Sequence, residues 1–531
     1  MSSQLLKRLL LIAFGVAVLQ VSLQGKCLNK KFKLGDYGND EAAIAQLVAD
    51  VNANGGGRVV FPANAVIEVS LGDDFSCGYT ALPKPSSILF GFYGCKKVSV
   101  DLNGSTIVLK GNHSTKYIFF LFRDCKKFSL KNGTIIGDSR THDYSPVIYR
   151  GQEIKTSHQW GYGVQVAGSS GIISHMTVSN MIGDGVYVSS FKDGPMVTHT
   201  RVNVEDCEIS FCRRNGVTVA STKGCKIANT KIHHIGTYNG IRGASPQAGI
   251  DFEYEDGVGD IGAIEVVNCK IYDCTEKTVS ASNTTPPTSS VFLVSKSYFE
   301  GSEFQIAKVQ AYKGKRVVGC HFKNVSLFCG DAMVEGCEFD LGSSLSYVHG
   351  TRFKDCSFEG EKESQGTKYG CCLVGNTLNK ASFRNCTFKC IRGRNDASTF
   401  QGFSGYHFPL NAEFNNCHFF DCSFVIGNPE KESELSFTDC SFEDGCLIQN
   451  RGERVISFTR SRLENVSSFS NQNGCFSFNK CELIQDDPGI EYPIIYYGRH
   501  QVRNSTIKNT LPISESMRRR GVSRALIQEI D

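Results

Sequence analysis

The chain has 531 residues, of which 57 are basic and 53 are acidic, and its formal net charge at neutral pH is +4. Because the charges nearly balance and are dispersed along the sequence, no bulk positive field attracts a nucleic acid, and we expect no nucleic-acid partner. The length suffices for two or three ordinary domains, or for one continuous solenoid.

The first residues have the pattern of a secretory signal. Lys7 and Arg8 precede an apolar stretch from Leu9 to Leu19, which a more polar segment follows up to Gly25. The apolar stretch is too short to cross a bilayer. We therefore predict a signal peptide over residues 1–25, a secreted or periplasmic protein, and no membrane span in the mature chain.

A helix and a strand are predicted at the start of the mature chain, over residues 26–70. Asn39 is the expected N-cap of a helix over Asp40–Asn54, and Arg58–Ala63 has the pattern of a strand. The apolar face of the helix comprises Ala43, Ile44, Leu47, Val48 and Val51. A helix across the first coil would form an N-terminal cap that shields the open end of a solenoid.

Most of the remaining chain repeats a short consensus: a β-branched or aromatic residue, two mostly polar residues, a cysteine, one polar residue, and Phe, Ile or Leu. It surrounds nine cysteines: Cys207, Cys269, Cys320, Cys337, Cys356, Cys386, Cys417, Cys440 and Cys481. Successive copies such as 320 to 337 and 337 to 356 are 17 and 19 residues apart, within the range of solenoid coils. We predict an all-β fold, a parallel β-helix over residues 71–500, with a C-terminal tail over 501–531.

The cysteines follow the strand pattern of the repeat. Val202, Val204, Cys207 and Ile209 alternate with polar residues, which indicates a strand. Stacking the copies about 4.8 Å apart would align their cysteines in an interior ladder of free thiols. We prefer this interpretation to a disulfide framework, because the repeat itself supplies the core that small disulfide-rich domains lack.

The segment from Gly35 to Ala63 resembles the start of pectate-lyase-like proteins, a superfamily of right-handed parallel β-helices. The likeness rests on Asp36-Tyr37-Gly38, the predicted helix, Gly55-Gly56-Gly57 and Phe61-Pro62-Ala63. It implies a right-handed parallel β-helix with a polysaccharide as partner. The superfamily includes polysaccharide lyases, glycoside hydrolases, uronate epimerases and viral tailspikes, so the fold alone selects no reaction.

Four segments share a Gly-aliphatic-x-apolar pattern, starting at Gly163, Gly185, Gly216 and Gly249. If their apolar residues point inward, the third residue of each segment points outward, and the four become neighbours on one sheet. These residues are Gln165, Tyr187, Thr218 and Asp251. We predict that this strip is the floor of a substrate groove.

Carboxylates and arginines gather around the strip. Asp251 and Glu253 lie two residues apart on one strand face, where they suit a general acid and base or a calcium site. Asp184, in a Gly-Asp-Gly turn, is a third catalytic candidate. Arg213 or Arg214 would neutralise a uronate in a lyase, the one case in which Ca2+ is an expected cofactor.

Four residues are candidates for contact with the sugar: His158, Trp160, Tyr187 and Gln165. His158 and Trp160 would form a stacking edge at the head of the strip, whereas Tyr187 and Gln165 lie on its floor. The alternative for Trp160 is a purely structural packing role.

The charged candidates also have structural alternatives. Asp184 can simply cap a turn, and the two arginines can form surface ion pairs with Asp206 and Glu208. The adjacent histidines 233 and 234 lack further ligands at a metal-binding spacing, so we predict no metal site there.

The motifs leave the reaction open. Polygalacturonase-type hydrolases carry paired aspartates where this chain has Asp184 followed by Gly185, and their Arg-Ile-Lys motif is absent. We predict a secreted protein that binds and cleaves a polysaccharide as a glycoside hydrolase or lyase. An epimerase, a noncatalytic glycan-binding or adhesive β-helix, and a trimeric tailspike are the alternatives; the later coils, which lack an acidic cluster, favour the noncatalytic one.

Overall fold

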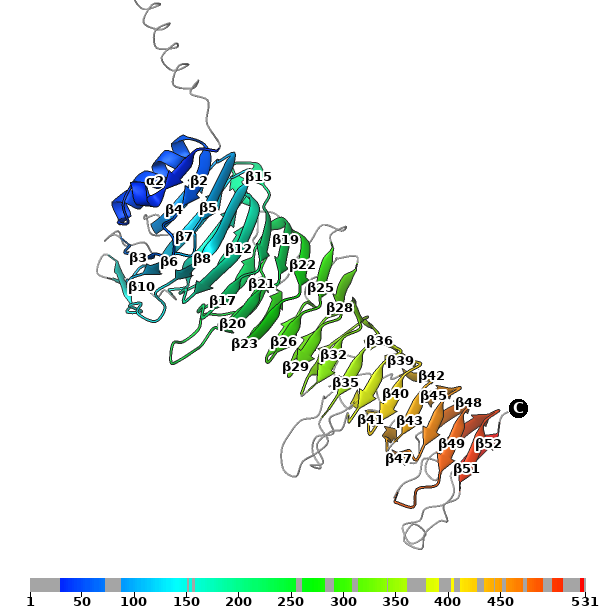
Figure 1. Cartoon of the computed structure of the whole chain (residues 1–531). Helices are drawn as coiled ribbons and strands as arrows, with labels where there is room; N and C mark the ends of the chain where they lie inside the picture. Colours follow the sequence, from blue (N-terminus) through cyan, green and yellow to red (C-terminus); the bar gives the residue numbers. More distant parts are fainter. Residues whose placement is uncertain are drawn as a thin grey trace, which may run out of the picture.

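The computed structural model describes most of the chain after the predicted signal peptide, which lies outside the described residues. These are residues 29–71, 87–149, 152–154, 158–254, 260–281, 291–307, 314–340, 342–360, 379–390, 403–404, 411–426, 434–443, 445–450, 455–470, 475–489, 499–509 and 526–529. They form one elongated stack of short strands (Figure 1).

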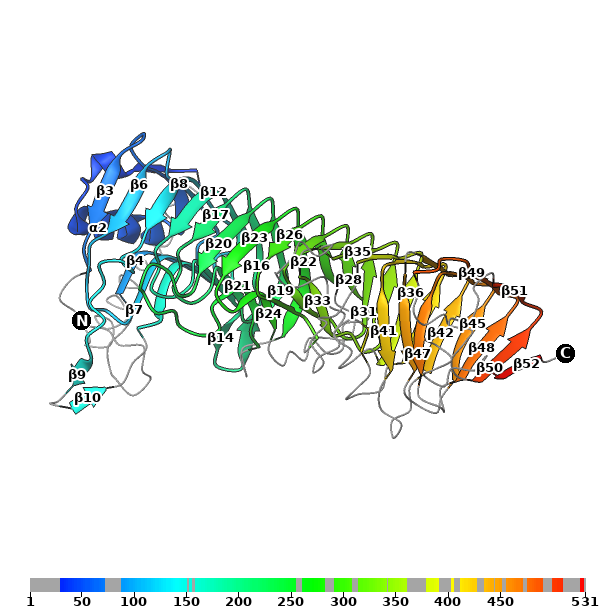
Figure 2. The ribbon, with the colours of Figure 1, turned by 90° about the horizontal axis from the view of Figure 1, so that it is seen from below.

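Strands of successive coils pair in parallel along the stack, as Figure 2 shows from a second side. Within the described residues, one sheet has 34 strands and a second has ten. In chain order, the ten are β4 (Ser87–Tyr93), β7 (Lys116–Arg123), β11 (Trp160–Ala167), β13 (Val186–Ser189), β18 (Val217–Val219), β21 (Ala248–Phe252), β24 (Lys277–Ala281), β27 (Glu303–Gln305), β30 (Ser326–Phe328) and β33 (Ser344–Tyr347). The chain is thus an all-β right-handed parallel β-helix, as predicted.

The one α-helix of the described chain, α2 (Glu41–Ala53), lies at the N-terminal end of the stack (Figure 1). Its apolar face packs on β2 (Gly56–Val60) and β4. The N-cap is Asp40, whose carboxylate accepts a hydrogen bond of 2.7 Å from the amide of Ala43. The helix therefore starts one residue later than predicted from Asn39, and its role as a cap stays a prediction.

Each copy of the cysteine consensus forms two short strands joined by a bend. The residue before the cysteine adopts a positive φ in all nine copies, as in Asp206 (54°), Gly319 (59°) and Asn385 (54°). Asp, Asn and Gly tolerate this left-handed conformation best, which explains why they dominate that position. The bend after β16 (Arg201–Glu205) turns the chain into β17 (Glu208–Ser210) and directs the side chain of Cys207 inward.

Equivalent residues form ladders through the core. Six phenylalanines stack with neighbouring ring centroids 4.6–4.9 Å apart: Phe322, Phe339, Phe358, Phe388, Phe419 and Phe442. The nineteen described cysteines are thiols outside any disulfide, and seventeen of them are buried. The predicted ladder of interior thiols is confirmed for these residues.

The four glycine-led segments align as predicted. β11, β13, β18 and β21 place Gln165 beside Tyr187, Tyr187 beside Thr218, and Thr218 beside Asp251. The leading glycines also stack, because a Cβ at Gly216 would lie 2.5 Å from the carbonyl oxygen of Gly249. Only glycine allows this close approach of successive coils.

Parallel pairing continues into the segment predicted as a tail. β50 (Arg499–Arg503), β51 (Thr506–Asn509) and β52 (Leu526–Glu529) extend the 34-stranded sheet. Among the described residues, no helix combines the length and apolarity that a membrane span requires.

Candidate functional site

The outer face of the ten-stranded sheet carries a group of charged side chains from three successive coils. Asp184 precedes β13, Arg214 precedes β18, and Asp251 and Glu253 lie in and just after β21. We call these four residues the carboxylate cluster. Ile250 and Phe252 of β21 face the apolar core, so the alternation of this strand directs Asp251 away from it.

Arg214 joins two of the carboxylates. Its two terminal nitrogens donate hydrogen bonds of 2.9 Å to Asp184 Oδ2 and 2.6 Å to Glu253 Oε2. The side chain of Glu253 is 43% exposed, whereas that of Arg214 is 10% exposed. The predicted alternative, surface ion pairs of Arg214 with Asp206 or Glu208, is therefore wrong for this residue.

Asp184 does more than cap a turn. Its side chain is fully buried and also accepts hydrogen bonds from the amide of Asn215 (3.1 Å) and the hydroxyl of Thr218 (2.8 Å). Burial raises the pKa of Asp184, and the positive charge of Arg214 opposes this rise. Asp184 therefore ties the turn before β13 to the next coil.

Asp251 is the carboxyl group with a proton-binding affinity suited to neutral pH. It is 2% exposed. Burial, followed by the negative charge of Glu253, raises the pKa of Asp251 to about 7, while Arg214 and a hydrogen bond with Ser280 act in the opposite direction. The cluster contains three carboxyl groups and one guanidinium, and a proton on Asp251 relieves the excess of negative charge.

The sequence identified Thr218 as part of the strip but gave neither it nor Asn215 a role in the site. The amide nitrogen of the Asn215 side chain donates to Thr218 Oγ1 (2.9 Å) and Asp251 Oδ2 (3.2 Å), and its oxygen accepts from the backbone of Ala248 (3.0 Å). This network fixes the buried carboxyl groups relative to one another. The position of Asn215 directly after the two arginines was the one signal in the sequence.

Arg213 does not join the cluster. It donates hydrogen bonds of 2.7 Å to the backbone oxygens of His158 and Arg242, and its guanidinium carbon lies 4.8 Å from the ring centroid of Tyr144. The two consecutive arginines therefore bind different partners on opposite sides of their turn. The predicted pairing of Arg213 with Asp206 or Glu208 is not observed.

His158 is buried, so the prediction that it forms a stacking edge for sugar is wrong. Its Nδ1 lies 3.0 Å from Nε2 of His142, whose Nδ1 lies 2.6 Å from the carboxylate of Asp138. Burial, with the nearby His142, lowers the pKa of His158 to about 4, which keeps its ring neutral at physiological pH. No pattern in the sequence indicates Asp138 and His142, because they lie in a turn outside the repeat.

Aromatic residues continue the outer face next to the cluster. The rings of Tyr162 and Tyr187 are stacked, with centroids 4.9 Å apart and an angle of 17° between the planes. Trp160 and Tyr187, both partly exposed, pack against an outer apolar group that contains Tyr162. Gln165 pairs with Tyr187 in the sheet register. Three of the four predicted sugar-contact residues thus lie together, on the coils that precede Asp251.

The site does not fit a calcium ion as it stands. Arg214 already occupies the position between Asp184 and Glu253 that a shared cation would take. Among the described residues, no group of three His, Cys, Asp or Glu side chains is arranged to hold a metal ion.

No protein-family model matches the chain. It is 28% identical over 164 residues to YclG of Bacillus subtilis strain 168, which covers 30% of this chain and 26% of YclG. It is 30% identical over 139 residues to the SPbeta prophage-derived protein YorA of the same strain, covering 25% of this chain and 22% of YorA. The chain therefore matches only about a quarter of the length of these relatives.

Solved structures similar to the chain include the catalytic domain of Agl-KA, with a TM-score of 0.34, 11% identity, and coverage of 94% of this chain and 67% of that one. Another is the A-module of the mannuronan C-5 epimerase AlgE6 of Azotobacter vinelandii, with a TM-score of 0.32, 10% identity, and coverage of 94% and 99%. Both are pectate-lyase-like right-handed β-helix proteins. These TM-scores are too low to define the fold of this chain. Its fold class rests on the strand pairing described above.

Proposed function

We propose that the protein is a secreted carbohydrate-active β-helix that binds a polysaccharide along the outer face of the ten-stranded sheet and hydrolyses it at the carboxylate cluster. The arrangement of two carboxylates on the guanidinium of Arg214, with the buried carboxyl group of Asp251 tied to them through Asn215, carries this proposal. Paired carboxyl groups are the usual machinery of glycoside hydrolysis.

Asp251 and Glu253 are the catalytic residues of the proposed reaction. Asp251 is 2% exposed, so the bound polysaccharide must displace the side chains that cover it. Its carboxyl group then donates a proton to the leaving glycosidic oxygen, a role that suits a carboxyl group with a pKa near neutrality. Glu253, the solvent-facing member of the cluster, accepts a proton from the attacking water. The water adds across the glycosidic bond and leaves one new reducing end. Arg214 and Asp184 are positioning residues. Arg214 donates a hydrogen bond to Glu253, and Asp184 holds Arg214 in place.

Hydrolysis by paired carboxyl groups fits the cluster better than an elimination in which an arginine removes a proton from a sugar carbon. Two neighbouring carboxylates raise the pKa of Arg214, although its burial opposes them, so this guanidinium stays protonated. Arg213 is committed to backbone oxygens outside the cluster. Neither arginine is therefore available as the base of a lyase.

The purified mature protein should be tested on a panel of neutral and uronic-acid polysaccharides. We expect new reducing ends without the ultraviolet absorbance of unsaturated uronates, and we expect Asp251→Asn to abolish their release. The variant Glu265→Gln, on the exposed face of β22 (Ile261–Val267), is the matched control. Unsaturated products would overturn hydrolysis in favour of a lyase.

The outer aromatic residues favour a second candidate function, noncatalytic binding of a glycan. Stacked tyrosines beside a partly exposed tryptophan form the kind of surface on which sugar rings pack. Binding of a polysaccharide without any product, weakened by Tyr187→Ala, would support this function over hydrolysis.

A further inference from the structure

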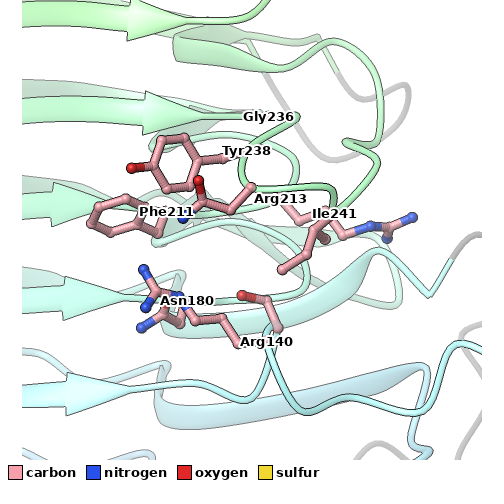
Figure 3. Close-up of a pocket in the computed structure, with 9 residues that line it drawn as sticks. Arg140, Asn180, Phe211, Arg213, Gly236, Tyr238 and Ile241 are labelled. Carbon is pink, nitrogen blue, oxygen red and sulfur yellow. The ribbon is translucent and has the colours of Figure 1, made fainter.

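A separate cavity of about 230 Å³ lies beside the turn that carries both arginines. Turns that follow four neighbouring strands enclose it: β8 (Phe128–Ile136), β12 (Ser170–Ser179), β17 (Glu208–Ser210) and β20 (Lys231–Ile235). Figure 3 shows the residues of these turns that line it. We call this cavity the arginine pocket. Its lining includes Arg140, Asn180, Phe211, Arg213, Tyr238 and Ile241.

The charge of the arginine pocket has one sign. Arg140 and Arg213 line it, and its described lining contains no carboxylate. The guanidinium carbon of Arg140 lies 5.0 Å from the ring centroid of Phe211. Arg140 is exposed, so its remaining nitrogens can reach a ligand. A guanidinium offers a planar fork of donors that suits a carboxylate or a sulfate.

The other side of the pocket is aromatic. The ring of Phe211 lies 4.9 Å from those of Tyr238 and His234, measured between centroids. Phe211 and Tyr238 are partly exposed where they line the cavity. Aromatic faces of this kind pack against the C–H face of a sugar ring.

Asn180 supplies an independent sign that a ligand belongs here. Its side-chain oxygen is buried and accepts no hydrogen bond from the described residues. A buried acceptor without a donor is unfavourable, so a hydroxyl group delivered to this wall would remove an existing penalty. The volume is smaller than the roughly 300–1,000 Å³ of pockets that hold drug-sized molecules, which limits the occupant to about one ring.

We propose that the arginine pocket is a subsite for one anionic sugar unit, a ring that bears a carboxylate or a sulfate. The exposed guanidinium of Arg140 pairs with the anionic group, Phe211 packs against the ring, and the side-chain oxygen of Asn180 accepts a hydrogen bond from a hydroxyl. This inference rests on the proposed function, because the sugar unit belongs to the same polysaccharide. Arg213 lines the pocket and Arg214 holds the cluster, so one turn connects the bound anion with the proposed site of cleavage.

The test uses the full mature chain and three small probes: methyl glucuronoside, methyl glucoside 6-sulfate and neutral methyl glucoside. Binding is measured by titration calorimetry at low and high salt. We expect the anionic probes to bind at least tenfold more tightly than the neutral one, and the difference to shrink as salt screens the guanidinium groups. Preference for the uronate or the sulfate identifies the anionic group.

Variants locate the binding. Arg140→Gln should weaken the anionic probes about tenfold, whereas Arg352→Gln, an exposed arginine on β34 (Arg352–Lys354), should leave their binding unchanged. Phe211→Leu should weaken all three probes. Equal binding of neutral and anionic probes, or full affinity in Arg140→Gln, would overturn the proposal.

Failure of the subsite and failure of the proposed function give different results. If Asp251→Asn abolishes cleavage but Arg140→Gln changes no binding, the subsite is wrong and the hydrolase stands. If the probes bind through Arg140 but no polysaccharide is cleaved or bound, the proposed hydrolase function is wrong. The arginine pocket is then not a subsite for a polysaccharide substrate.

Discussion

Arg214 donates a hydrogen bond of 2.9 Å to the carboxylate of Asp184, which lies one coil earlier and is fully buried. The pair links two coils in a place where neither charge is well hydrated. Burying charges is costly unless each has a partner, so the arrangement depends on both members. Their bond also fixes the guanidinium that holds Glu253 at the surface.

Arg214→Gln should destabilise the protein markedly. It leaves the carboxyl groups of Asp184 and Asp251 buried without a positive charge, a change that typically costs about 3–5 kcal/mol. We expect a clearly lower midpoint in thermal unfolding, and a change within about 0.5 kcal/mol for the exposed Arg352→Gln. Equal midpoints for the two variants would show that the ion pair does not stabilise the coils.

The stability of the protein should depend on pH through Asp251. Its pKa rises from an ordinary value of about 4 to about 7 in the fold, so the folded state binds more protons than the unfolded chain between these values. The contribution of Asp251 to the free energy of unfolding is therefore largest in acid. It decreases as the pH rises from about 4 to about 7, and it stays low at higher pH.

Asp251→Asn removes this titration. We expect the thermal midpoint of the variant to change less than that of the wild type between about pH 5 and about pH 8, while Glu265→Gln follows the wild type. Parallel curves for Asp251→Asn and the wild type would contradict the raised pKa.

The register of the site could be predicted from the sequence because it follows a repeat. Each glycine-led segment begins with a residue that has no space for a Cβ, so Gly216 and Gly249 must stack, and Thr218 then lies beside Asp251. The alternation of side chains along each strand then determines which residues point into the core and which point away from it. The interior position of the nine consensus cysteines follows in the same way from the bend before each of them.

The turns could not be predicted in this way. Arg213 and Arg214 are adjacent in the chain and face different partners, and no periodicity distinguishes them. His158 is buried and contacts His142, which lies in an irregular segment 16 residues earlier. Such contacts depend on how the turns pack against one another, information that a repeat pattern does not contain.

Gly216→Ala should strain the stack of glycines. The added Cβ would lie 2.4 Å from Ile232 Cγ2 and 2.5 Å from the oxygen of Gly249, and such overpacking typically costs about 1–3 kcal/mol. Gly224→Ala is the matched control, because its Cβ would meet nothing closer than 3.7 Å. The two variants are compared by thermal unfolding, and a similar midpoint for both would refute the close approach of the coils.

Phe388→Ala should open a cavity in the phenylalanine ladder. The ring lies between those of Phe358 and Phe419, at centroid distances of 4.7 and 4.9 Å, and is fully buried. Truncations of this kind cost about 3–5 kcal/mol. Val455→Ala, at a position 38% exposed, should change the midpoint little. A mild effect of Phe388→Ala would mean that the later coils tolerate gaps.

Binding and turnover should be compared in Asp251→Asn, on the polysaccharide that the wild type cleaves. We expect the variant to bind this polysaccharide with affinity close to that of the wild type and to release no reducing ends. Reducing-end release at the wild-type rate would contradict the assignment of Asp251 as the acid and would remove the carboxylate cluster as the site of cleavage.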